Sequence, residues 1–344
     1  MVTGTALSTA IRVENLSVSY GPQRGDAGQR VLSGASFSVP KGRILGIVGT
    51  AGSGKTALGR VLSGRGLVSH EGETPWISGG QAEVAGIDLR RPSRDDLRRL
   101  TLDIGYLSQT SGDELRNDLT IAENIADPIL SRDRDFDQRA LGRAAAMLID
   151  AVDLELGMLN RFPFELSRGQ RQRVAFAKAL IVEPAVFIVD EPAQGVDIIA
   201  RPALFSLLER LNRARDLTMI VISHDLATIE RLTSEVLVVD RGVVLAQGDI
   251  DEVLRDPDDE YLRRLRDARE FARAPLPGLV DRETIAAAER VVGGLFADED
   301  LEAEAVDAAE QDRQRLIEDR PEFARFHHEV TEASTDATTK DAKE

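Results

Sequence analysis

The sequence has no cysteine among its 344 residues. This absence excludes disulfides, thiolate zinc sites, cysteine-ligated iron–sulfur clusters and a cysteine nucleophile. An excess of positive charge is also missing, since 43 Lys and Arg stand against 59 Asp and Glu and the formal net charge is −16. So acidic a chain argues against a general nucleic-acid coat and against a polybasic membrane anchor. The length is enough for about two domains.

Long hydrophobic runs are missing as well. The longest, such as AVFIV (185–189) and TMIVI (218–222), have the length of strands and are far too short for a bilayer-spanning helix. The first twenty residues show no basic segment followed by an apolar core, and residues 11–20 alternate like a strand, so we expect no signal peptide. The composition therefore predicts a cytosolic chain, unless a partner holds it at a membrane.

Short apolar runs that end in polar residues recur between residues 11 and 247, and stretches 141–156 and 202–215 between them have helical periodicity. Buried parallel strands show this pattern, with functional groups at their carboxyl ends, so we expect an α/β fold. The expected strands are 43–49, 102–109, 185–191, 218–225 and 235–242, followed by a closing hairpin strand at 241–249.

The composition changes after about residue 256. A charged helical pattern over 260–273 is followed by prolines at 275 and 277, and residues 298–344 carry 16 acids and 6 bases. The final residues are small and polar, which is typical of disorder. We therefore expect a domain over 9–255 and an acidic extension over 256–344 that is mostly helical or disordered. The extension is either a solvated tail or a regulatory, partner-binding arm.

The segment GTAGSGKT (49–56) fits the pattern G-x4-G-K-[ST] and lies between an apolar strand and a helical run. Its glycines allow backbone N–H groups to ring a phosphate chain, and the helix N-terminus adds roughly half a positive charge. Lys55 is expected to reach the β- and γ-phosphates and Thr56 to bind magnesium. A chance Gly-rich turn is the alternative. The expected phosphate contacts are Gly49, Thr50, Ala51, Gly52, Ser53, Gly54, Lys55 and Thr56.

Two adjacent carboxylates, Asp190 and Glu191, end the apolar run AVFIVDE. Acids beside a buried strand are costly unless they serve a cation or a reacting group. Asp190 is therefore expected in a magnesium shell, and Glu191 is expected to orient or deprotonate an attacking water. An exposed strand end without such a role is the alternative.

Between these two motifs lies FELSRGQRQRV (164–174), and the order of the three resembles the ATP-binding subunits of ABC transporters. Further residues match that family one by one. Tyr20 matches the aromatic residue that stacks on adenine, and Gln109 the glutamine that touches magnesium and the nucleophilic water. Asp197 matches the aspartate of the loop that crosses to the partner subunit, and His224 the switch histidine at the γ-phosphate.

The resemblance implies a P-loop NTPase core of RecA type, an antiparallel β subdomain, and an α-helical subdomain inserted at about 113–165. It also implies two subunits that enclose two ATP molecules with Mg²⁺, each ATP between the phosphate loop of one subunit and the signature of the other. Ser167 and Gly169 would approach the partner's γ-phosphate, and Gln170 would start the helix and reach the ribose. Arg168 stands where a glycine is expected; it either faces the triphosphate or turns to solvent.

Local features resemble the oligopeptide, dipeptide and nickel importer branch of the family. They are the segment 161–180 around the signature, the insertion 69–100 and the run LTIAENIADPIL at 119–130. Two features depart from that branch. The chain lacks its HPYT-like run and cysteine cluster, which excludes an iron–sulfur site, and the loop AQGVD keeps only its aspartate.

The resemblance implies an ATPase that energises import of peptides or similar small solutes from the cytoplasmic face of the membrane, as a peripheral subunit. Its partners would be two permease subunits docking beside Gln109 and the helical subdomain, a second ATPase subunit, identical or related, and an extracytoplasmic solute-binding protein, but no nucleic acid. The alternatives are an exporter, a non-transport ABC ATPase, and a regulatory subunit without catalysis. The short, cysteine-free interval before the signature disfavours DNA-repair ATPases, and the presence of Glu191 and His224 favours hydrolysis.

Overall fold

The computed structural model describes residues 8–273, apart from 22–27, 66–73, 195 and 197–200. The chain divides into two compact units, Met1–Arg273 and Ala274–Glu344, and the described residues all belong to the first. The predicted extension 256–344 therefore lies partly within this unit, and its part beyond Arg273 lies outside the described residues. Asp197 lies outside them as well.

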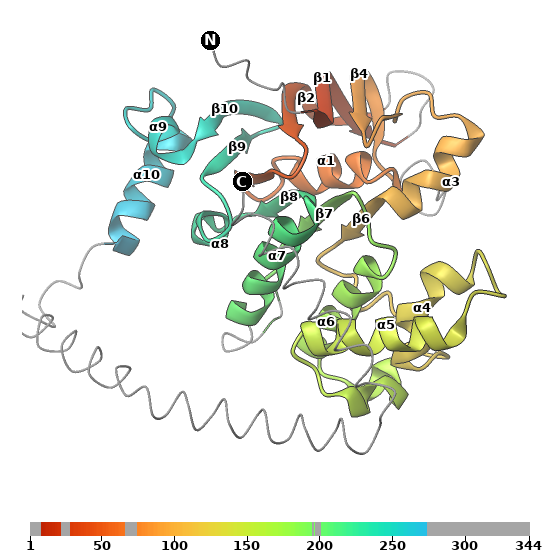
Figure 1. The fold of residues 1–344 in the computed structure, drawn as a ribbon. Helices are drawn as coiled ribbons and strands as arrows, with labels where there is room; N and C mark the ends of the chain where they lie inside the picture. Colours follow the sequence, from red (N-terminus) through yellow and green to blue (C-terminus); the bar gives the residue numbers. More distant parts are fainter. Residues whose placement is uncertain (1–7, 22–27, 66–73, 195, 197–200, 274–344) are drawn as a thin grey trace, which may run out of the picture. The chain divides into compact units, whose positions relative to one another are not determined.

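A six-stranded sheet, in the order β10-β9-β3-β8-β7-β6, forms the centre of the described unit (Figure 1). Its strands are parallel except β10, which pairs antiparallel with β9 as the expected hairpin. Every residue of β7 and β8 is buried, because both faces of the sheet are covered by other elements. The strands are β3 (Ile44–Gly49), β6 (Ile104–Leu107), β7 (Val186–Asp190), β8 (Thr218–Ser223), β9 (Glu235–Asp240) and β10 (Val243–Asp249).

The two faces of this sheet enter different hydrophobic cores. Phe187 and Val189 of β7 point into a core built by α4 (Ile121–Leu130), α5 (Gln138–Ala151), α6 (Arg168–Leu180) and α7 (Arg201–Arg215). Val186 and Ile188 point into a core shared with α1 (Lys55–Leu62) and a second sheet. This alternation follows from the period of two along a strand. The signature-bearing helix α6 and the phosphate-loop helix α1 thus lie against opposite faces.

The second sheet is four-stranded and antiparallel, in the order β2-β1-β4-β5. In β2, buried and exposed residues alternate, as expected for a sheet with one face on a core. This sheet is the antiparallel β subdomain that the resemblance implied. Its strands are β1 (Thr9–Tyr20), β2 (Gln29–Pro40), β4 (Trp76–Val84) and β5 (Ile87–Asp88).

Side-chain caps set where most of the long helices begin. Ser93, Thr120 and Ser167 each accept a hydrogen bond from the backbone three residues on, in reciprocal capping boxes. The helices are α1 (Lys55–Leu62), α3 (Arg94–Asp103), α4 (Ile121–Leu130), α5 (Gln138–Ala151), α6 (Arg168–Leu180), α7 (Arg201–Arg215), α8 (Leu226–Glu230), α9 (Ile250–Val253) and α10 (Glu260–Arg273), with 3-10 turns at Leu156–Asn160 and Pro163–Glu165.

Several predicted boundaries differ from the structure. The strand predicted at 102–109 is shorter, because α3 continues to Asp103 and passes directly into β6. The helix predicted at 141–156 begins earlier, at Gln138, because Asp137 accepts hydrogen bonds from the next backbone N–H groups and starts the helix there. It also ends earlier, at Ala151.

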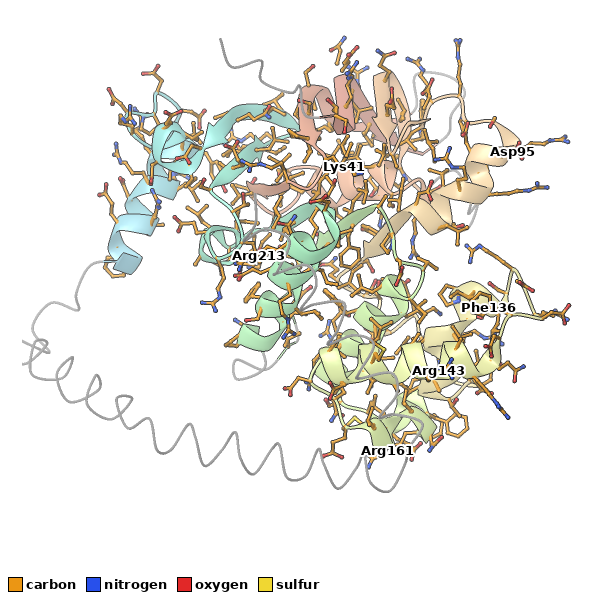
Figure 2. The ribbon with its side chains drawn as sticks, in the orientation of Figure 1. Lys41, Asp95, Phe136, Arg143, Arg161 and Arg213 are labelled. Carbon is orange, nitrogen blue, oxygen red and sulfur yellow. The ribbon has the colours of Figure 1, made fainter. Side chains whose placement is uncertain are left out.

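Helices α4, α5 and α6 share one core, and several large apolar side chains of α5 and of the adjoining turns are exposed (Figure 2 labels Phe136). The exposed fractions are 40% for Phe136, 53% for Met147, 45% for Leu156 and 67% for Phe164. In the described part of the chain, no helix combines the length and the apolar character that crossing a bilayer requires.

Helix α10 is anchored in this same unit. The guanidinium of Arg269 forms ion pairs with Glu230 at the end of α8, at 2.7 Å, and with Asp251 of α9, at 2.6 Å. The Arg269 side chain is only 12% exposed, so α10 is held against α8, the helix that follows His224.

Candidate functional site

The loop between β3 and α1 has the geometry of a phosphate cradle. Gly54 caps α1 at φ 97°, and a Cβ there would lie 2.4 Å from Val31 O. At Gly49 a Cβ would lie 1.9 Å from Val239 O, since β3 and β9 are neighbours. Both positions therefore require glycine, and the tight turn they permit aims the first N–H groups of α1 outward.

Lys55 is folded back over this loop and is only 7% exposed. Its Nζ donates hydrogen bonds to three neutral acceptors, Gly49 O at 2.9 Å, Thr50 O at 2.7 Å and Ser53 Oγ at 3.3 Å. Burial lowers the pKa of the ammonium, and the charges of Glu191, Asp190 and Asp240 oppose this. A phosphate chain bound to the loop would supply the anionic partner that these acceptors do not.

Asp190, at the end of β7, is fully buried, and neither carboxylate oxygen has a hydrogen-bond partner within the described residues. Burial raises its pKa to about 6; the Thr56 side chain opposes the rise and the Glu191 charge adds to it. A buried carboxylate without partners is costly, and a hard cation would compensate it. The donor set of Asp190 and Thr56 thus fits Mg²⁺.

No three His, Asp or Glu side chains gather into a metal-holding group anywhere in the described ranges. A cation held by Asp190 and Thr56 would accordingly draw most of its remaining ligands from phosphate oxygens and water, as Mg²⁺ commonly does.

Glu191 follows Asp190 in a left-handed conformation, with φ 55°. Its backbone N–H donates to Ile222 O at 2.9 Å, so the turn after β7 is tied to the end of β8. Its Oε1 accepts from the backbone N–H of His224 at 2.9 Å and lies 2.8 Å from that residue's Nδ1, and its Oε2 accepts from Ser223 Oγ at 3.1 Å. The structure therefore brings Glu191 and His224 together in one network.

This network orients a carboxylate that can still reach solvent. The Glu191 side chain is 15% exposed, and that of His224 is 68% exposed. A half-buried carboxylate fixed by three hydrogen-bond contacts is arranged to accept a proton or orient a water with little reorganisation.

Two further predicted residues, Gln109 and Tyr20, follow or end strands of the two different sheets. Gln109 is exposed in the turn that follows β6, the strand beside β7. Tyr20 ends β1, packs against the core shared with α1, and lies beside Arg60 of that helix. The indole Nε1 of Trp76 donates to Gly21 O at 3.1 Å and so fixes the backbone directly after Tyr20.

The signature begins α6. Ser167 is the N-cap, with its Oγ accepting from Gln170 N at 3.3 Å, and Gln170 Oε1 accepts from Ser167 N at 2.9 Å. The prediction that Gln170 starts the helix is wrong, because the cap at Ser167 starts it at Arg168. The side chain of Gln170 is used in the capping box, where it had been predicted to reach a ribose; Arg168 is exposed.

Within the described residues, no hydrogen bond or ion pair joins the signature segment Ser167, Arg168, Gly169 and Gln170 to the phosphate loop of the same chain. This separation agrees with the packing of α1 and α6 on opposite faces of the sheet.

Several residues of the site were not among those predicted from the sequence. Thr50 Oγ1 donates to Asp240 Oδ1 at 2.5 Å, which braces the phosphate loop against the end of β9. Asp240 ends an apolar run as Asp190 does, so the same pattern could have indicated it. No local pattern pointed to Ser223 or Trp76, because their partners are distant in the sequence.

The chain matches the protein family described as ABC transporter over residues 32–194. It is 33% identical over 245 residues to the oligopeptide transport ATP-binding protein OppF of Salmonella typhimurium, covering 70% of this chain and 69% of OppF. It is 31% identical over 272 residues to the methionine import ATP-binding protein MetN of Caulobacter vibrioides, covering 79% and 76%.

A longer relative is the oligopeptide transport ATP-binding protein OppD of Mycobacterium tuberculosis, with 32% identity over 265 residues and 75% of this chain covered. The match spans only 41% of that protein's length. Among solved structures, the dimeric ATP-binding cassette MJ0796 with ADP and Pi shares the fold, with a TM-score of 0.61, 24% identity, and coverage of 70% of this chain and 98% of that one.

The raised pKa of Asp190 predicts a pH-dependent stability. The native fold holds this proton more tightly than the unfolded chain, so ionisation destabilises the fold as the pH rises from about 4 to about 6, and the loss stays above that. The difference between this pKa of about 6 and the ordinary aspartate pKa of 3.8 corresponds to at most about 3 kcal/mol. Without metal or nucleotide, Asp190→Asn should be more stable than wild type at pH 8 and nearly equal to it near pH 4, measured by urea unfolding.

The exposed Asp135 provides the control. The difference between Asp135→Asn and wild type should not change across this pH window. If the difference in unfolding free energy between Asp190→Asn and wild type is the same at both pH values, burial does not destabilise the ionised carboxylate.

Proposed function

We propose that this chain, which belongs to the ABC transporter family, is an ATP-hydrolysing subunit that energises import of peptides or similar small solutes through separate permease subunits. The observation that carries the proposal is the cluster at the ends of β3, β7 and β8, where Lys55, the buried Asp190 and the oriented Glu191 meet. Phosphate binding, cation binding and proton acceptance are the three tasks of nucleotide hydrolysis.

Nucleotide binding would begin at the phosphate loop. The backbone N–H groups at the start of α1 and the ammonium of Lys55 would hold the β- and γ-phosphates, with Thr50 braced by Asp240. Asp190 and Thr56 would hold Mg²⁺, which when bound neutralises charge on the triphosphate. The adenine would rest on Tyr20, whose following residue is fixed by Trp76.

Hydrolysis would depend on Glu191. Its carboxylate would orient the attacking water and accept the proton as the bond from water oxygen to the γ-phosphorus forms. Ser223 and His224 hold that carboxylate in place, and His224 would in addition contact the γ-phosphate. Gln109 would complete the water and magnesium contacts from the turn after β6.

Each site would be completed by a second subunit. Within the described residues, the phosphate loop and the signature of one chain share no hydrogen bond or ion pair, and the N-terminus of α6 suits a γ-phosphate on a facing subunit. Ser167, Gly169 and Asp197 would serve that facing site, and the pair could be a homodimer or a heterodimer. The dimeric cassette that shares this fold supports the arrangement.

The permease subunits would dock on the helical subdomain near Gln109, at the cytoplasmic face of the membrane. The exposed Phe136, Met147, Leu156 and Phe164 support this, since large apolar side chains gathered on one subdomain favour a protein partner. Relatives named for peptide and for methionine import support small solutes as cargo, with an extracytoplasmic binding protein supplying them.

Co-purification tests the transport role. The tagged chain is expressed together with the membrane proteins that adjacent genes encode. Two permease subunits should then co-purify with it in detergent. Phe164→Ser, on the exposed surface of the subdomain, should reduce their recovery, whereas Val243→Ser, at an exposed apolar position on β10, should not. Stable recovery of soluble DNA-repair or chromosome partners in place of permeases would favour a non-transport ATPase.

Substitution of Glu191 tests hydrolysis itself. Glu191→Gln should leave ATP binding intact and lower phosphate release by at least about 100-fold, because the neutral amide cannot accept the proton. Lys55→Ala should instead weaken ATP binding by roughly tenfold or more, because a charge-assisted contact is lost. Both are measured on purified protein, with permeases present if needed. Turnover near wild type in Glu191→Gln would remove this residue from the role.

Arg168 tests how far the signature tolerates variation. A cation in the first turn of α6 opposes the helix dipole by about 0.3 to 1 kcal/mol, a small effect beside the attraction of a triphosphate. Because Ser167 and Gln170 form the cap without Arg168, Arg168→Gly should keep steady-state hydrolysis within about fivefold of wild type. Complete loss of hydrolysis would instead make the guanidinium a necessary part of the site.

A further inference from the structure

Gln172 is a buried amide, 5% exposed, on the first turns of α6. Its Nε2 donates to Ser108 O at 3.0 Å, and its Oε1 accepts from Gly112 N at 3.0 Å. These two backbone groups are the ends of the turn that carries Gln109. Both polar atoms of one buried side chain are thus used to close that turn on α6.

The turn lies directly on the helix backbone. A Cβ at Gly112 would come within 2.8 Å of Gln172 N and 3.0 Å of Arg171 C, so only glycine permits this approach. Arg171 adds a second link, since its guanidinium pairs with Asp113 at 3.3 Å and donates to Leu166 O at 2.8 Å. The contact between turn and helix is therefore tight and has several components.

The turn is also compact within itself. The backbone N–H of Ser108 donates to Ser111 Oγ at 2.9 Å, and the two hydroxyl oxygens lie 3.0 Å apart. With both ends held by Gln172 and the interior closed by these serines, the exposed Gln109 is placed by α6. We propose that Gln172 is a positioning residue that fixes the Gln109 turn to the signature helix, so that both move as one body.

This inference rests on the proposed function and extends it. In the proposed pair, Gln109 serves the nucleotide of its own subunit, while Ser167, five residues before Gln172 and about 7.5 Å away along α6, serves the facing nucleotide. One buried amide then links the two half-sites of a subunit. Any displacement of α6 by the facing nucleotide would move Gln109 as well. Packed elements with two discrete arrangements couple distant sites in this way.

A double-mutant cycle tests this placement. Gln172→Met keeps the side-chain volume but removes both hydrogen bonds, and should lower kcat for ATP hydrolysis about tenfold, as a misplaced catalytic geometry does, while KM for ATP stays within about twofold. In a Gln109→Ala background, the same change should alter kcat by less than about twofold, because the residue through which it acts is gone.

Gly112→Ala provides a second variant, which pushes the turn from α6 and leaves Gln172 in place. It should show the same split between kcat and KM, and the same loss of effect in the Gln109→Ala background. If Gln172→Met does not fold, this variant decides the outcome.

Asn124 is the matched control. It is fully buried, and its amide likewise closes a turn, with bonds from Arg116 N and to Arg116 O and Leu119 O, but that turn carries no site residue. Asn124→Leu should lower the urea midpoint without lowering kcat.

Equal losses of kcat from Gln172→Met with and without Gln109, or a wild-type kcat in Gln172→Met, would overturn the inference. Absence of ATP hydrolysis by the wild-type protein would overturn the proposed function and this inference with it.

Discussion

The site depends on two opposite charges that the fold buries without pairing them. The ammonium of Lys55 is satisfied only by neutral oxygens of its own loop, and the carboxylate of Asp190 has no hydrogen-bond partner in the described residues. Each would be stabilised by a direct ion pair, yet no hydrogen bond or ion pair joins the two groups within the described residues. A polyphosphate with its cation has the charges that both groups lack, so ligand binding relieves an electrostatic cost that folding leaves in place.

The remaining groups are arranged around this pair by the ends of adjacent strands. Asp190 and Glu191 leave β7, Ser223 and His224 leave β8, and Asp240 leaves β9 to brace the phosphate loop. Parallel strands place their carboxyl ends on one edge, which explains why residues almost 200 positions apart meet. Helix α6 packs on the opposite face of the sheet from α1, so the signature lies away from the phosphate loop of the same chain.

The parts of the site that depend on local spacing could be predicted from the sequence. The phosphate loop, the two acids after β7 and the approximate positions of the parallel strands follow from patterns within ten residues. Gln172, Ser223 and Trp76 could not be predicted, because each acts on a segment more than 30 residues away and has no local pattern. The cap formed by Ser167 and Gln170 could have been predicted, since the spacing S-x-x-Q is local. Without it, the start of α6 was predicted at the wrong residue.

The close contact at Gly49 has a genetic consequence. Every single-base change of a glycine codon that yields another amino acid introduces a Cβ atom, and at this position that atom would lie 1.9 Å from a backbone oxygen of β9. Backbone cannot rotate away as a flexible side chain can, so no stepwise substitution passes through a tolerated intermediate. Descendants of this chain that keep β3 beside β9 are therefore confined to glycine at residue 49.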